Sequence, residues 1–95
     1  MIKILILTDR PMRWYYMLLN MIDFDMVYNL KDRIELRNKL FYFLIEADMP
    51  ENKRGGAYAH VILDKKIDED TFYKILMPTI KQKVTHHGLD KILDN

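Results

Sequence analysis

Four acidic residues stand at or just beyond the ends of apolar segments: Asp9, Glu46, Asp48 and Asp64. If those segments are parallel strands, their carboxyl ends meet at one edge of a sheet. Carboxylate oxygens are the ligands that Mg²⁺ prefers, and a bound Mg²⁺ orients water and neutralises phosphate charge. One prediction is therefore a Mg²⁺ site that handles phosphoryl groups. The alternative is that each strand simply ends at a polar residue, and an antiparallel last strand would send Asp64 to the opposite edge.

Histidines and a basic loop are the other candidates for chemistry. His60 shares a strand face with Tyr58 and Ile62, which suits either a general base or a hydrogen-bonded packing residue. His86 and His87 are adjacent and diverge in any regular structure, so they make a poor chelate. The loop 50–56 carries Lys53 and Arg54 before two glycines. It leads into a strand, whereas a phosphate-binding loop leads into a helix, so we interpret it as a surface turn or contact arm.

The pattern of apolar residues predicts one small α/β domain, 1–95, in the order β-α-β-α-β-β-α. Segment 2–7 is apolar on both faces, typical of a central strand. A helix over 11–22 begins at Pro11, and a short strand follows at 26–28. Because a helix joins the two strands, we expect them to form a parallel pair. A second helix is expected from an Asn29 cap, then strands at 41–45 and 57–63, in either relative direction. A last helix begins near Asp68 and kinks or ends at Pro78, and 81–95 forms a loosely ordered tail. These elements give a three- or four-stranded sheet with helices packed on it.

Composition excludes several classes of protein. The formal charge is +1, from 15 basic and 14 acidic residues, so no global field indicates nucleic-acid or membrane binding. A local basic patch could still form from Arg10, Arg13, Arg33, Arg37 and Lys39. However, acidic neighbours such as Asp32 and Glu35 indicate that Arg33, Arg37 and Lys39 belong to a solvated helix face. The sequence has no cysteine, which excludes disulfides and thiolate metal sites. No apolar run approaches the roughly 20 residues of a membrane span, and the first is too short for a signal peptide. We expect a cytoplasmic protein.

Two short segments resemble the receiver domain of response regulators. The run 2–11, Ile-Lys-Ile-Leu-Ile-Leu-Thr-Asp-Arg-Pro, looks like the start of that domain, and 46–50, Glu-Ala-Asp-Met-Pro, is similar to the segment around its phosphorylated aspartate. The resemblance implies that Asp9 is a metal ligand and that Glu46 takes the phospho-acceptor position, where it acts as a permanently charged mimic. The chain departs from the family by having one Asp in place of an acidic pair, a shorter spacing to Glu46, and a strand after Met-Pro.

The helix 11–22 has more apolar surface than packing on one sheet requires. Tyr15, Leu18, Leu19 and Ile22 form one stripe, and Trp14, Met17 and Met21 form a second beside it. Trp, Tyr, Met and Arg are enriched in interface cores, although wide burial within a small domain is the alternative. We therefore predict a partner-binding face with an accessory loop, formed by Met12, Arg13, Trp14, Tyr16, Met17, Lys53 and Arg54.

Two functions follow from these observations. The first is a non-enzymatic binding protein that docks on a protein partner or on a second copy of itself, without a cofactor. Its size and composition also suit a small regulator, such as a phage protein that inhibits a host component. The second is a Mg²⁺-dependent phosphoryl-handling or receiver-like domain that uses the strand-end carboxylates. The sequence favours the first, because no complete catalytic constellation is present.

Overall fold

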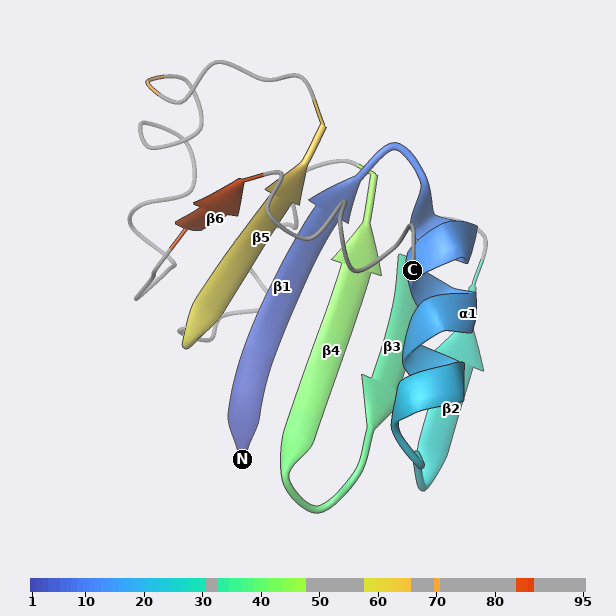
Figure 1. Cartoon of the computed structure of the whole chain (residues 1–95). Coiled ribbons are helices and arrows are strands. Elements are labelled where there is room, and N and C mark those ends of the chain that lie inside the picture. The colour runs from blue at the N-terminus through green and yellow to red at the C-terminus, as the bar shows by residue number, and fades with distance from the viewer. Residues whose placement is uncertain (31–32, 48–57, 66–69, 71–83, 87–95) are drawn as a thin grey trace.

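In the computed structural model, one helix packs on a mixed sheet (Figure 1). The structure describes residues 1–30, 33–47, 58–65, 70 and 84–86. Its elements are β1 (Ile2–Thr8), α1 (Pro11–Met21), β2 (Met26–Asn29), β3 (Arg33–Arg37), β4 (Phe41–Glu46), β5 (His60–Asp64) and β6 (Val84–His86). The α/β class is confirmed. The described part holds six strands, however, more than the three or four predicted.

The strands lie in the order β2-β3-β4-β1-β5-β6. β1 pairs in parallel with both β4 and β5, and β6 adds a further parallel strand beyond β5. β2, β3 and β4 form an antiparallel meander. β1 therefore lies inside the sheet, as its two apolar faces predict. The direction of β5, which the sequence leaves open, is parallel to β1.

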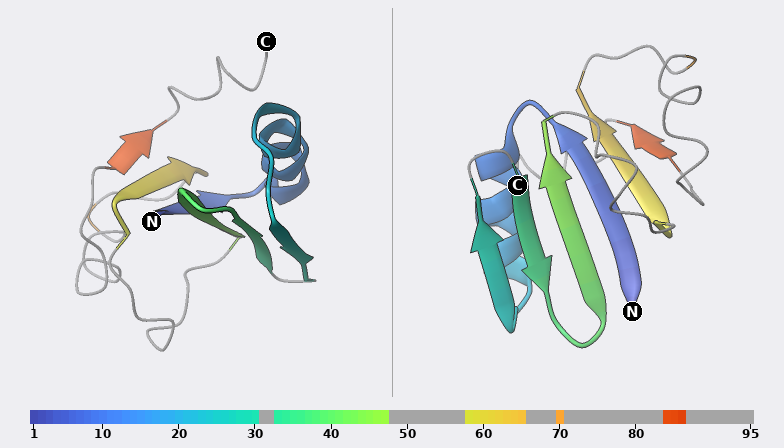
Figure 2. Two further views of the ribbon diagram at one scale, coloured as in Figure 1. Left: turned by 90° about the horizontal axis from the view of Figure 1, so that it is seen from below. Right: turned by 180° about the vertical axis from the view of Figure 1, so that it is seen from behind.

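The two faces of the sheet carry separate apolar clusters. α1 covers one face, which we call the helix face, over the side of the sheet formed by β2, β3 and β4 (Figure 2). There the buried residues are Ile4, Ile6, Trp14, Leu18, Ile34, Leu36, Phe43 and Ile45. On the opposite face the buried residues are Leu5, Leu7, Leu44, Tyr58, Val61 and Leu63. Because successive residues of a strand point to opposite faces, β1 and β4 supply buried residues to both clusters in alternation.

The helix predicted after Asn29 is wrong, because β3 and β4 form a hairpin there. The segment Arg33–Arg37 alternates charged and apolar residues, so Ile34 and Leu36 reach the helix face while the charges lie opposite. Asn38 closes the turn, since its Oδ1 accepts the N–H groups of Leu40 and Phe41, each at 2.8 Å. The same segment also has a helical spacing, in Leu30, Ile34, Arg37, Leu40 and Phe41. The strand forms instead because its period-two alternation buries apolar side chains on the sheet.

The predicted pairing of the first two strands is also wrong. β1 and β2 run in the same direction, but β4 and β3 lie between them. The helix 11–22 is confirmed as α1, with Pro11 in its first turn. No helix among the described residues is long and apolar enough to cross a membrane. The predicted helix near Asp68 and the loop 50–56 lie outside the described residues, and within the predicted tail only β6 is described.

Candidate functional site

Asp64 ends β5 and receives hydrogen bonds from three side chains. Thr8 Oγ1, at the end of β1, donates to Asp64 Oδ2 at 2.9 Å, and Trp14 Nε1 donates to the same oxygen at 2.7 Å. Arg10 Nη2 donates to Oδ1 at 2.7 Å and to Oδ2 at 3.0 Å. Thr8 Oγ1 also accepts the Arg10 N–H at 2.9 Å. The Asp64 side chain is 7% exposed and that of Arg10 is 40% exposed.

These contacts determine the charge state of Asp64. Burial alone raises the pKa of Asp64, but the hydrogen bonds from Trp14, Arg10 and Thr8, together with the charge of Arg10, bring that pKa below its ordinary value of 3.8. Asp64 is therefore ionised at neutral pH, and both its oxygens are engaged. It holds the start of α1 against the ends of β1 and β5, which is a structural role.

The other predicted metal ligands do not gather around Asp64. Glu46 pairs in register with Leu7, while Asp64 pairs with Thr8, so the two carboxylates lie on opposite faces of the sheet. Asp9 is exposed, and its Oδ1 lies 3.8 Å from Nζ of Lys65, which also donates to the Ala47 carbonyl. Asp48 lies outside the described residues. Among the described residues no group of three His, Asp or Glu side chains is placed to hold a metal ion.

Only part of the predicted binding face of α1 lies on the exposed side of the helix. Trp14 was expected on that face, but it is only 2% exposed, because its indole N–H reaches the buried Asp64. Met17 is half-buried against the helix-face cluster. Met12, Tyr16 and Leu19 are 40%, 59% and 37% exposed. Arg13, next to Met12 in the sequence, is also exposed. Lys53 and Arg54 lie outside the described residues.

Met12 connects this helix surface to the edge strand β2. Asn29 Nδ2 donates to Met12 Sδ at 3.8 Å, so the start of α1 lies against the end of β2. All four residues of β2 are exposed. Val27 pairs with Leu36 of the helix face, so its side chain lies on the same side of the sheet as α1. Met12, Tyr16, Leu19 and Val27 are exposed apolar residues on the α1 side of the sheet, and we call this group the α1–β2 surface.

The backbone of β2 also presents hydrogen-bonding groups. Leu30 N–H donates to the Arg33 carbonyl at 2.9 Å, which makes this a hydrogen-bonded pair. Antiparallel ladders alternate, so Tyr28 and Met26 also face β3 with their backbone groups. The N–H and C=O groups of Val27 and Asn29 are therefore directed away from β3. In the described part of the chain, no strand pairs with that side of β2.

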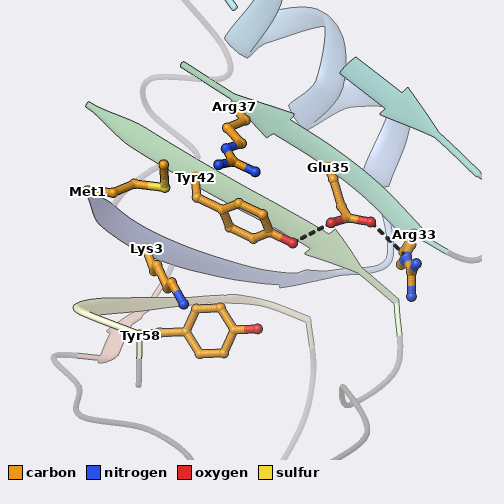
Figure 3. A pocket seen from close by; sticks show the side chains of 7 residues that line it. All are labelled: Met1, Lys3, Arg33, Glu35, Arg37, Tyr42 and Tyr58. Atoms are coloured by element: carbon orange, nitrogen blue, oxygen red, sulfur yellow. Dashed lines mark hydrogen bonds and ion pairs between the residues drawn. The ribbon is translucent and has the colours of Figure 1, made fainter. Parts of the chain in front are cut away.

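A pocket of about 380 Å³ opens on the face of the sheet opposite α1 (Figure 3). Its lining comes from the start of β1, from alternate positions of β3, from β4 and from the residues before β5: Met1, Lys3, Arg33, Glu35, Arg37, Tyr42 and Tyr58. Three of these side chains are cationic and one is anionic. The side chains that line the pocket therefore carry a net positive charge.

Glu35 is the centre of the hydrogen bonding in this pocket. The Tyr42 hydroxyl donates to Glu35 Oε1, and Arg33 Nε lies 3.0 Å from Glu35 Oε2 as an ion pair (Figure 3). Burial, the hydrogen bond to Glu35 and the negative charge of Glu35 all raise the pKa of Tyr42 above its ordinary value of 10.0. Tyr42 therefore stays protonated, and the charge of Glu35 is offset by Arg33.

Sequence reasoning missed this pocket because it assigned Arg33 and Arg37 to a helix. Read with period two, Arg-Ile-Glu-Leu-Arg places all three charged residues on one face of a strand, which is the signal that locates the pocket. His60, a candidate base, is exposed at the start of β5. His86 ends β6, and His87 lies outside the described residues.

Comparisons with known proteins supply no family for this site. The chain matches no protein-family model, no curated protein and no solved structure.

Proposed function

We propose that this chain is a non-enzymatic binding protein that associates with a second copy of itself through the β2 edge and the α1–β2 surface. The observation that carries the proposal is the pair of residues Val27 and Asn29, whose backbone groups face away from β3. An edge strand with such groups is a template for pairing with another strand. We place the protein in the cytoplasm, as its lack of cysteine allows.

β2 is a short edge strand of four residues, but it lacks the charged residues and the proline with which many proteins block edge pairing. Its sequence is Met-Val-Tyr-Asn, with no charged residue and no proline. The side chains of Met26, Val27 and Tyr28 are 40%, 39% and 49% exposed. A solvent-facing edge strand of this composition favours pairing with another uncharged strand.

A second copy fits this edge because antiparallel pairing of two β2 strands is self-complementary. With a twofold axis at Tyr28, Val27 exchanges backbone hydrogen bonds with the partner's Asn29, and Asn29 does the same with the partner's Val27. Tyr28 then lies opposite the partner's Tyr28, and cross-strand aromatic pairs of this kind stabilise sheets by roughly 0.2–1 kcal/mol.

The same axis brings the helices to one side of the joined sheet. Antiparallel strands of one sheet are related by an axis perpendicular to it, so both copies of α1 lie on the same face and flank the axis. Met12 and Leu19 of each copy then border the new interface. Burial of these exposed side chains adds about 25 cal/mol for each Å² of apolar surface removed from water.

The test is the oligomeric state of the full chain by sedimentation velocity over a range of concentrations. The Val27→Pro variant removes an N–H that faces away from β3, which an edge strand tolerates, and it should be monomeric where the parent is a dimer. Val27→Thr keeps that N–H and should still dimerise. Tyr28→Lys places like charges across the axis and should also dissociate the dimer. A parent chain that is monomeric throughout, or a Val27→Pro variant that dimerises as well as Val27→Thr, would overturn the proposal.

A further inference from the structure

The pocket on the face opposite α1 has two cationic side chains that its internal contacts do not use. Glu35 is engaged with Arg33 and Tyr42. Lys3 and Arg37 line the same pocket from β1 and β3, and both are exposed. Among the described residues, neither of these two side chains forms an ion pair or a hydrogen bond. The positive charge of Lys3 and Arg37 is therefore available to a ligand.

The positions of these two residues follow from the sheet register. Lys3 pairs with Tyr42 across β1 and β4, and Tyr42 pairs with Arg37 across β4 and β3. Lys3, Tyr42 and Arg37 thus form one row across three strands, on one face of the sheet. Figure 3 shows their side chains around the same hollow, with Tyr58 on its other side. A rigid sheet holds the two cations on either side of Tyr42.

We propose that this pocket binds a small organic phosphate, with the phosphate group held by Arg37 and Lys3. A guanidinium binds two phosphate oxygens at once, and an ammonium adds a point charge. Glu35 accepts hydrogen bonds, so it also provides a partner for a hydroxyl or amino group on the body of the ligand. The volume of about 380 Å³ lies within the range of small-molecule sites, roughly 300–1,000 Å³, and exceeds what free phosphate needs.

The ion pair of Arg33 with Glu35 contributes to selectivity. Arg33 Nε is buried and has no well-aligned hydrogen bond among the described residues, although it lies 3.0 Å from Glu35 Oε2. With Tyr42 also donating to Glu35, this carboxylate is fixed in place rather than free to pair with Arg37. The pocket therefore keeps separate regions for the anion and for hydrogen-bond donors, as a phosphate ester of a hydroxylated compound requires. This inference is independent of the proposed dimer.

The test is isothermal titration calorimetry of the full chain with adenosine monophosphate, inorganic phosphate and adenosine. We expect adenosine monophosphate to bind, inorganic phosphate to compete with it, and adenosine to show no heat. If inorganic phosphate binds as tightly as adenosine monophosphate, the anion site is supported, but its ligand is free phosphate and not an organic phosphate. Adenosine that binds as tightly as its monophosphate, or no binding by either phosphate at millimolar concentration, would overturn the proposal.

Variants at the pocket give a second, independent readout. Arg37→Gln and Lys3→Gln should each weaken binding about tenfold, the usual loss for one charge-assisted hydrogen bond. Lys39→Gln is the matched control, because it removes one positive charge from the turn after β3 without touching the pocket lining, and it should change affinity less than about twofold. Because Lys3 and Arg37 are both exposed, circular dichroism should show that neither substitution changes the fold. Equal losses in the Arg37→Gln and Lys39→Gln variants would show a diffuse charge effect and contradict a site.

Discussion

The indole N–H of Trp14 donates a hydrogen bond of 2.7 Å to Asp64, and this contact joins the first turns of α1 to the end of β5. The two residues are 50 positions apart in the sequence. Trp14 is 2% exposed and Asp64 is 8% exposed, so neither partner can find a replacement in water. The orientation of α1 on the sheet therefore depends on a buried carboxylate as well as on apolar packing.

Replacement of Asp64 by Ala should lower the free energy of unfolding by about 2–3 kcal/mol. The substitution leaves the donors of Trp14 and Thr8 buried without an acceptor, while Arg10 is partly exposed and regains water, which limits the loss. Urea unfolding followed by circular dichroism measures the change. Asp9→Ala, at an exposed carboxylate, should cost less than about 0.5 kcal/mol. Similar losses in both variants would contradict the role of Asp64.

The Trp14→Phe variant should show energetic coupling to Asp64. Phe keeps most of the apolar contact with the helix-face cluster but removes the N–H donor. In a double-mutant cycle with Asp64→Ala, the two losses should therefore sum to more than the loss of the double variant, by about 1 kcal/mol. Strict additivity would mean that the hydrogen bond contributes nothing to stability.

Acid should destabilise the protein through Asp64. The pKa of Asp64 in the folded state is lower than its ordinary value of 3.8, so the folded state is stabilised when Asp64 is ionised. That stability is fully present above about pH 4 and is lost as the pH falls through the lower folded pKa. Acid unfolding of the parent, followed by the fluorescence of Trp14, should therefore be steeper below pH 4 than that of Asp64→Asn. Parallel acid limbs for the two proteins would contradict this assignment.

Alkali should reveal the environment of Tyr42. Burial and Glu35 raise the pKa of Tyr42, so the neutral phenol is stabilised in the fold. The corresponding stability is present below the ordinary value of 10.0 and is lost as the pH rises toward the folded pKa. Ultraviolet difference spectra should show a late tyrosine ionisation in the parent chain, and this late transition should be missing in Tyr42→Phe. Glu35→Gln should move it to lower pH, and a late transition that persists unchanged in Glu35→Gln would exclude Glu35 as a cause.

Asn38 should be the sequence determinant of the β3–β4 hairpin. Its side-chain oxygen accepts two backbone N–H groups of the turn, and its own side-chain amide donates to the Asp23 carbonyl at 3.0 Å. Asn38→Ala should therefore lower the free energy of unfolding by about 1–2 kcal/mol. The exposed Asn20 in α1 offers a matched control, and Asn20→Ala should be neutral or slightly stabilising because Ala favours helix. A neutral Asn38→Ala variant would show that strand pairing alone fixes the turn.

Local patterns in the sequence predicted the elements that have one dominant signal. β1 is apolar on both faces and lies inside the sheet, and Pro11 marks the start of α1. The segment 30–41 contains both a helical stripe and a period-two alternation, and the outcome depends on whether β4 is available as a neighbour. That information is tertiary, so propensity alone could not decide between helix and strand.

The orientation of α1 illustrates a second limit. Trp14 and Tyr16 are both aromatic and two positions apart, and nothing in their neighbours distinguishes the buried ring from the exposed one. The distinction arises from Asp64, which offers a buried acceptor to an indole N–H but lies at the end of a distant strand. The pocket also depends on tertiary pairing, because Lys3, Arg37 and Tyr42 meet only when three strands have paired.

The position of β1 between β4 and β5 has a consequence for biosynthesis. β1 leaves the ribosome well before its two partner strands, since Ile4 pairs with Phe43 on one side and with His60 on the other. The β2–β3–β4 meander closes through short connections and can form early, whereas the parallel pairs must first close long loops. A nascent chain therefore carries an unpaired, strongly apolar strand until β4 and β5 have been made. Chaperone demand during translation, more than stability after it, should limit the yield of folded protein.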